Sequence, residues 1–450
     1  MQWLKVLGLL LALAVYQRAQ AQTATVTWGT MDQTIDGFGV WDAFQGSAMT
    51  GANADTLFSP TSGAGLSLLG TLIPSGASDS PGDCSTVNSG CAGTNTGDMT
   101  LAVARGARIF SAAWTPPASM KSNGSYTNGG SLLVGSYGAY ATWLTNYVES
   151  VQTYFNITPY GVSVQEEPDQ NVAYDSAIWS PQNLHDFILN NLGPSFASAG
   201  LTTKIMMPQA SCADLLAKYA NTTMEDSAAA AYVGIVADED FCNNQVSYTT
   251  GGAGTAAKPD WMVATGPLGS GAFDPSIGTA LTFAQQIHSS MTLGWAAWCF
   301  WTWHSSNPNQ QLIDISTGTV SKTLYAMGQW SKFVRPGWVH IDSTANPQTG
   351  VYVTAFKSSS GSYAVVAINT NHSATSQTFT FSGFPSTTSI TPWVTSSTLS
   401  LATQPAVAVE GDSFSFSLPA ESVTTFVGAA SGSSTGGPVA PPSLLSVSVK

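Results

Sequence analysis

The feature that most constrains the fold is a regular alternation of short apolar segments with longer stretches of helical periodicity between residues 35 and 335. Eight segments have the length and composition of buried strands: 35–39, 66–73, 107–113, 161–164, 204–207, 233–236, 260–263 and 293–300. Three connections show apolar residues at helical spacing: 137–154, 181–192 and 277–291. Strands that alternate with helices form parallel sheets, so this pattern predicts an α/β fold, a closed (β/α)8 TIM barrel over residues 35–335.

The remainder of the chain differs in composition and in its pattern of apolar residues. Residues 336–427 are rich in Thr, Ser and Val and alternate polar with apolar side chains, which predicts an all-β side domain, a sandwich. Residues 22–34 alternate in the same way and are expected to add a strand to that sandwich. The Gly/Ser/Pro-rich residues 428–450 are expected to form a flexible tail.

The first residues have the pattern of an export signal. Lys5 precedes an apolar run at 6–15, and Ala19 and Ala21 are small residues at the positions that a signal peptidase reads. The run is too short to span a bilayer. We therefore expect residues 1–21 to be a signal peptide and the protein to be secreted.

Export permits disulfide bonds, and the chain has five cysteines. Cys84 and Cys91 flank a polar loop and are the first predicted pair, and Cys212 and Cys242 are candidates for a second. Cys299 lies in an apolar run and is interpreted as a buried thiol.

Charge and composition narrow the classes of partner. The formal net charge is −13 with only 13 Lys plus Arg, which argues against binding to nucleic acid or to anionic membranes. Charged residues make up 9% of the chain and aromatic residues 10%, a balance that suits a protein handling a neutral polysaccharide or oligosaccharide. The five histidines lack metal-ligand spacing, so no cofactor is expected. We expect a monomer.

Two adjacent glutamates follow the fourth predicted strand. The apolar segment 160–164 is followed by Gln165, Glu166, Glu167, Pro168 and Asp169. A strand interior would not tolerate unpaired buried charges, so the two carboxyls are expected at the strand's exit, the face of a TIM barrel where catalytic groups gather. There a carboxyl can act as a general acid or base. The alternative is an ordinary acidic loop in an acidic protein.

Several segments at predicted strand ends together resemble glycoside hydrolase family 30. They are IDGFG at 35–39, IFSAAWTPPASMK at 109–121, VSVQEEPD at 162–169, WCFWTWH at 298–304 and GQWSKFVRPG at 328–337. The resemblance runs in order over roughly residues 30–427. It implies a (β/α)8 barrel with a side β-sandwich, and retaining hydrolysis by two glutamates whose carboxyls are about 5 Å apart.

The family's catalytic motifs fall on identifiable positions. Its Asn-Glu-Pro motif falls on 166–168, which makes Glu167 the acid/base and places Glu166 where the family has Asn. Its nucleophile, the Glu of a Trp-x-x-Glu pattern after the seventh strand, falls on Ala264, which cannot be a nucleophile. The next carboxylate along the chain, Asp274, is ten residues away in an expected loop.

Two more positions near the missing nucleophile differ from the family's pattern. An Arg common after the family's second strand corresponds to Gly70, and the His before an aromatic residue corresponds to Glu239, with Phe241 close by. One hypothesis is a rebuilt site in which Glu239 supplies the second carboxylate. Another is a catalytically silent carbohydrate-binding protein, and a third is an ordinary retaining enzyme whose nucleophile has been replaced by Ala264. Glu239 is alternatively a solvated loop acid between Asp238 and Asp240.

Aromatic residues are candidates for substrate binding, because flat rings stack on sugar faces. The aromatic candidates, which are alternatively core residues, are Trp41, Trp114, Phe241, Trp301 and Trp303, and Glu166 is a further candidate for substrate binding. Strand alternation predicts that Trp301 and Trp303 share one face. The resemblance implies xylan first and β-1,6-galactan or glucan second. The resemblance also implies that a family member requiring glucuronic acid side groups would carry a basic residue in the loop after the eighth strand. That loop, 305–311, contains no Arg or Lys, so strict dependence on glucuronic acid is not expected.

Overall fold

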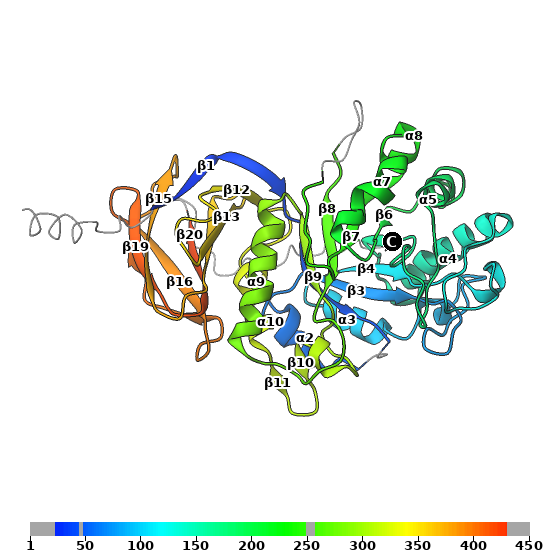
Figure 1. Cartoon of the computed structure of the whole chain (residues 1–450), viewed down its shortest axis with the longest axis horizontal. Coiled ribbons are helices and arrows are strands. Elements are labelled where there is room, and N and C mark those ends of the chain that lie inside the picture. The colour runs from blue at the N-terminus through cyan, green and yellow to red at the C-terminus, as the bar shows by residue number, and fades with distance from the viewer. Residues whose placement is uncertain (1–22, 45–47, 249–256, 430–450) are drawn as a thin grey trace, which may run out of the picture.

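The computed structural model describes residues 23–44, 48–248 and 257–429 and consists of a barrel and a β-rich domain side by side (Figure 1). Eight parallel strands close the barrel: β2 (Gly37–Asp42), β3 (Leu68–Ile73), β4 (Arg108–Ala113), β5 (Gly161–Ser163), β6 (Lys204–Pro208), β7 (Val233–Glu239), β8 (Asp260–Thr265) and β9 (Ala297–Phe300). Each overlaps one of the eight segments expected from the sequence. The prediction of a (β/α)8 barrel is therefore confirmed.

Helices cover the outside of the barrel. They are α2 (Gly51–Phe58), α3 (Thr96–Val103), α4 (Tyr137–Phe155), α5 (Pro181–Phe187), α6 (Gly193–Ser198), α7 (Leu216–Met224), α8 (Ser227–Ala230), α9 (Ile277–Thr292) and α10 (Lys322–Ser331). A π-helical segment, Ile188–Leu192, joins α5 to α6. In α4 the buried residues recur every three or four positions, which turns one face toward the strands.

The connection between β7 and β8 differs from the others. Its described residues, 240–248 and 257–259, contain no helix. Several contacts hold this segment against the barrel. A disulfide joins Cys242 to Cys212, Trp295 donates its indole N–H to the carbonyl of Val246 at 3.0 Å, and Tyr248 donates to Asn221 Oδ1 at 2.9 Å.

The second domain is built almost entirely of antiparallel strands. They are β12 (Val339–Ser343), β13 (Val351–Lys357), β14 (Ser362–Asn369), β15 (Thr375–Ser382), β16 (Ser389–Thr395), β17 (Ala402–Thr403), β18 (Val407–Ala408), β19 (Ser413–Leu418) and β20 (Ser422–Ala429). The N-terminal strand β1 (Thr23–Thr34) joins them, pairing with β12 on one side and in parallel with β15 on the other. Phe379, Phe414 and Phe426 meet inside, with ring centroids 4.8–5.1 Å apart.

Two helices attach the β-rich domain to the barrel. Figure 1 shows α9 and α10 between the two parts. Buried polar contacts fix this junction: Gln329 donates to Thr395 Oγ1 at 2.8 Å, and Thr425 donates to Gln329 Oε1 at 2.6 Å. A short hairpin, β10 (Ile313–Asp314) and β11 (Thr319–Val320), precedes α10.

The described cysteines pair as expected. Disulfides join Cys84 to Cys91 and Cys212 to Cys242, while Cys299 is a buried free thiol whose pKa is raised by burial. Of the helices in the described part of the chain, none is both long and apolar enough to cross a bilayer. The expected signal peptide, and all but the first residues of the expected tail, lie outside the described residues.

Candidate active site

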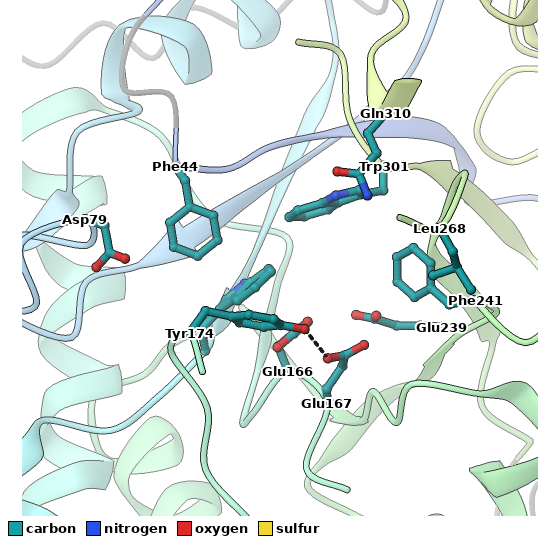
Figure 2. A pocket seen from close by; sticks show the side chains of 11 residues that line it. Phe44, Asp79, Glu166, Glu167, Tyr174, Glu239, Phe241, Leu268, Trp301 and Gln310 are labelled. Atoms are coloured by element: carbon teal, nitrogen blue, oxygen red, sulfur yellow. Dashed lines mark hydrogen bonds between the residues drawn. The ribbon is translucent and has the colours of Figure 1, made fainter. Parts of the chain in front are cut away.

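A cavity of about 390 Å³ opens at the carboxyl-terminal end of the barrel strands (Figure 2). Its walls come from the segments that follow most of the barrel strands: Phe44, Asp79, Trp114, Glu166, Glu167, Tyr174, Glu239, Phe241, Leu268, Trp301 and Gln310. This is the face on which TIM-barrel enzymes place their active sites.

Glu166 and Glu167 both face this cavity although they are neighbours in sequence. Strand alternation would point them apart, but β5 already ends at Ser163 and Glu167 has a left-handed backbone with φ of 42°. The backbone N–H groups of the two glutamates bond the carbonyls of Ala113 and Gln209 at 2.8 and 2.9 Å. The loop is thereby held to both neighbouring strand ends.

Glu239 reaches the cavity from the last residue of β7, where it pairs in register with Ala264 of β8. The interpretation of Glu239 as a solvated loop acid is wrong. The pairing of β7 with β8 extends to this residue, and its side chain is 1% exposed. Gln209 donates to its Oε1 at 2.8 Å, while Oε2 has no hydrogen-bond partner.

Three carboxyls therefore meet at one point. One oxygen from each of Glu166, Glu167 and Glu239 lies within 4.8 Å of the other two. Such all-oxygen ligands would suit a hard cation rather than zinc, and they are the only group of this kind in the described chain. Figure 2 shows the three side chains gathered across the cavity from Trp301.

Burial and mutual repulsion favour the protonated forms of these acids. Burial, followed by the charge of Asp169, raises the pKa of Glu167 to about 7, although Tyr174 donates a 3.3 Å hydrogen bond to its Oε2 and lowers the pKa somewhat. The pKa values of Glu166 and Glu239 are raised well above the usual range by burial and then by the neighbouring glutamates. The cluster therefore holds protons near neutral pH.

Three of the aromatic residues singled out from the sequence line the cavity: Trp114, Phe241 and Trp301. The ring centroids of Trp114 and Trp301 are 5.4 Å apart, and Phe44 packs edge-on against Trp114 at 4.6 Å. The sequence analysis did not identify Phe44, Asp79, Tyr174, Leu268 or Gln310. Only Tyr174 carried a signal, since it follows Glu167 by seven residues in the same loop.

Trp41 and Trp303 require a correction. Both are fully buried and neither lines the cavity. Trp41 donates its indole N–H to the carbonyl of Val263 at 2.6 Å, and Trp303 donates to Asp42 Oδ1 at 3.0 Å. These two indoles belong to the barrel core. The expectation that Trp303 shares a face with Trp301 is also wrong, because β9 ends at Phe300 and alternation does not extend beyond it.

The packing around Gly70 explains why no arginine stands there. A Cβ at this position would lie 2.6 Å from the ring of Trp41 and 2.7 Å from the ring of Phe110, so these side chains occupy the space. Ala264 is 1% exposed and does not line the cavity. Asp274 is exposed and accepts hydrogen bonds from Thr279 and from the backbone of Ser276, and it does not line the cavity either.

We expect Gly70→Ala to lower the free energy of unfolding by about 1–3 kcal/mol, because the added methyl group overpacks the barrel interior. Urea denaturation measures the change. Gly278→Ala on α9 is the matched control, since a Cβ there meets nothing closer than 3.8 Å and alanine favours a helix. Equal stability of the two variants would contradict this account of the packing.

A closed (β/α)8 barrel with clustered carboxyls at its strand ends, facing aromatic rings across a cavity, is the arrangement of a glycoside hydrolase. Residues 98–303 match the family model for the glycosyl hydrolase family 30 TIM-barrel domain, and residues 337–426 match that for the family 30 beta sandwich domain. The chain belongs to glycosyl hydrolase family 30.

Several proteins of known function are similar to the chain. Glucuronoxylanase XynC of Bacillus subtilis (strain 168) is 31% identical over 342 residues, covering 72% of this chain and 75% of the relative. Endo-1,6-beta-D-glucanase neg1 of Aspergillus fumigatus is 27% identical over 80% of this chain and 85% of the relative. The structure of the subfamily 8 xylanase Xyn30A from Clostridium acetobutylicum superimposes with a TM-score of 0.78 at 30% identity, covering 91% of this chain and all of that one.

Proposed function

We propose that this protein is a secreted glycoside hydrolase that cleaves a neutral cell-wall β-glycan, xylan first and β-1,6-galactan or glucan second. Relatives named as a glucuronoxylanase and an endo-1,6-β-glucanase support this order. None of the cavity-lining residues of the described chain is basic, and the loop 305–311 has no Arg or Lys. These facts argue against a requirement for glucuronic acid side groups.

The spacing of Glu167 and Glu239 is the observation that carries the proposal. Their closest oxygens lie within 4.8 Å, and carboxyls about 5–5.5 Å apart suit direct attack, whereas about 6.5–9.5 Å would leave room for a water. Glu239 ends the strand next to the one that carries Ala264. It is therefore in position to replace the glutamate that the family has on the neighbouring strand.

Each carboxyl has a defined part in the proposed reaction. Glu167 gives its proton to the leaving glycosidic oxygen while a Glu239 oxygen bonds to the anomeric carbon and the C–O bond breaks. A water then attacks that carbon and gives its proton to Glu167, which frees Glu239. The reaction starts from the form in which Glu167 is protonated and Glu239 is ionised. Burial and mutual repulsion make the two carboxyls share protons as one group, and the hydrogen bond that Gln209 donates to Glu239 Oε1 favours ionisation at Glu239.

Release of reducing ends from xylan, β-1,6-galactan and β-1,6-glucan tests the proposal, with Ala264→Glu as the comparison variant. We expect the unmodified chain to release reducing ends from at least one polymer, and Ala264→Glu to give no increase. Activity that appears only in Ala264→Glu would instead indicate an ordinary retaining site that lacks its nucleophile. Binding without turnover in both proteins would indicate a silent carbohydrate-binding protein. Thermal melting shows whether the variant is folded.

A further inference from the structure

The cavity walls carry several acidic side chains and no basic one. Four of its lining residues carry carboxyls, Asp79, Glu166, Glu167 and Glu239, and none of its lining residues is Lys, Arg or His. None of the four takes part in an ion pair recorded within residues 23–44, 48–248 and 257–429. Within the described walls, no cationic side chain pairs with these four carboxyls.

Two buried polar atoms in these walls lack partners and point to a ligand. Glu239 Oε2 and the indole N–H of Trp114 have no hydrogen-bond partner, and their residues are only 1% and 7% exposed. An unsatisfied buried polar group is costly, so such atoms commonly meet a ligand or water. Here one atom accepts a hydrogen bond and the other donates one.

Aromatic rings complete the enclosure. Trp114 contacts Trp301, Phe44 and Tyr174 at centroid distances of 5.4, 4.6 and 5.9 Å, and Phe241 lines the same cavity. Aromatic faces attract cations through their negative faces, and rings combined with carboxylates are a recurring way to hold an ammonium group. Figure 2 shows the rings and carboxyls around one space.

We propose that this cavity binds a sugar that carries a free amino group, as in a glucosamine-containing β-glycan, more tightly than the matching neutral sugar. The carboxyl triad is compact enough for its three oxygens to contact one ammonium group. An ammonium nitrogen that donates three tetrahedral hydrogen bonds of about 2.8 Å holds its acceptors about 4.6 Å apart. The oxygens of Glu166, Glu167 and Glu239 lie within 4.8 Å of one another. The proposal rests on the proposed function, because both concern one cavity.

The amino group would displace protons from the triad. Asp79 from the loop after β3, Glu166, Glu167 and Tyr174 from the loop after β5, and Glu239 from β7 line the cavity. Asp169 and Asp175 act electrostatically on Glu166, Asp238 interacts with Glu239, and Lys121 interacts with Asp175. Because the three glutamates hold protons near neutrality, an ammonium group binds as they ionise. Affinity for the amino sugar is therefore expected to rise with pH while the amine stays protonated, and affinity for a neutral sugar is not.

Calorimetric titration with three β-1,4-linked tetrasaccharides tests the proposal. Their sugars differ only at C2, which carries a hydroxyl (glucose), an acetamide (N-acetylglucosamine) or an ammonium group (glucosamine). At about pH 6 and constant ionic strength we expect the glucosamine tetramer to bind the unmodified protein about tenfold more tightly than either neutral tetramer. Glu166→Gln keeps the shape of the side chain but removes its charge, and it should abolish most of that preference. Asp412→Asn, in an exposed turn of the β-rich domain, is the charge-matched control and should keep it.

Equal affinity of the unmodified protein for the three tetramers would overturn the proposal, and so would a preference that persists in a folded Glu166→Gln variant. The two proposals fail separately. A protein that prefers the amino sugar but hydrolyses none of the neutral polymers would contradict the proposed function alone. Hydrolysis of a neutral polymer without the ammonium preference would contradict only the assignment of the amino sugar.

Discussion

Glu167→Gln is expected to lower kcat/KM for xylan by about 10²–10⁴-fold, because glutamine cannot protonate the leaving oxygen. Reducing-end release under first-order conditions measures the loss. An aryl xyloside with a good leaving group needs little protonation and should lose much less in the glycosylation step. Glu410→Gln, exposed in the β-rich domain, is the matched control and should leave both rates unchanged. A Glu167→Gln variant that hydrolyses xylan at the unmodified rate would contradict the assignment.

The pH dependence of the same rate gives a second measure of Glu167. Its pKa is raised to about 7, so the carboxyl keeps its proton up to near neutrality. The proton is needed for bond cleavage, so kcat/KM should fall as pH rises above about 7 rather than above the ordinary value for glutamate. An alkaline limb near pH 5 would show that burial and Asp169 do not hold this proton.

The barrel was predictable because its evidence is local. Each strand is a short apolar run, and each helix has its own periodicity, so 137–154 and 277–291 were recognisable without knowledge of the rest. The glutamates at 166 and 167 were recognisable for the same reason, since charge directly after a buried run marks a strand's exit. What the sequence could not give was that both face one cavity, because that depends on the left-handed backbone of Glu167.

Local sequence does not distinguish the tryptophans that line the cavity from those that are buried in the core. Trp41, Trp114, Trp301 and Trp303 all lie at or just past strand ends, yet two line the cavity and two are buried in the core. Whether each indole lines the cavity or is buried depends on the side chains that it meets from other strands. Trp41, for example, fills the space beside Gly70 and Phe110, which are distant in sequence.

The position of Glu239 in the site also depends on a contact between strands, so it could not be predicted from local sequence. From sequence it was one of three consecutive acids, Asp238, Glu239 and Asp240, and nothing local distinguished it as the one beside the glutamate pair. The register of β7 against β8 places it opposite Ala264, and the closure of the barrel brings it within 4.8 Å of Glu167 and Glu166. The alanine that replaces the family's glutamate at 264 and the glutamate at 239 therefore lie opposite each other on adjacent strands.

Glu239→Gln is expected to lower kcat/KM by about 10³-fold or more on xylan and on the aryl xyloside alike, since no oxygen remains to bond the anomeric carbon. Glu167→Gln is therefore expected to lose much less activity on the aryl xyloside than on xylan, whereas Glu239→Gln is expected to lose activity on both. The smaller Glu239→Ala variant leaves space for a small anion, so added azide should restore cleavage of the aryl xyloside and form the glycosyl azide. Unchanged hydrolysis by Glu239→Gln would exclude Glu239 as the second carboxylate.

The stereochemistry of the product decides how Glu239 acts. With closest oxygens within 4.8 Å, direct attack predicts two inversions and net retention, which proton NMR of the first-formed sugar detects. Inversion, with the same loss in Glu239→Gln, would mean that Glu239 activates a water and that the carboxyls move apart when substrate binds. Retention with a sugar bound covalently to Glu239, located by peptide mass, would mean that a glutamate from the sixth barrel strand performs the reaction that the family performs from the seventh.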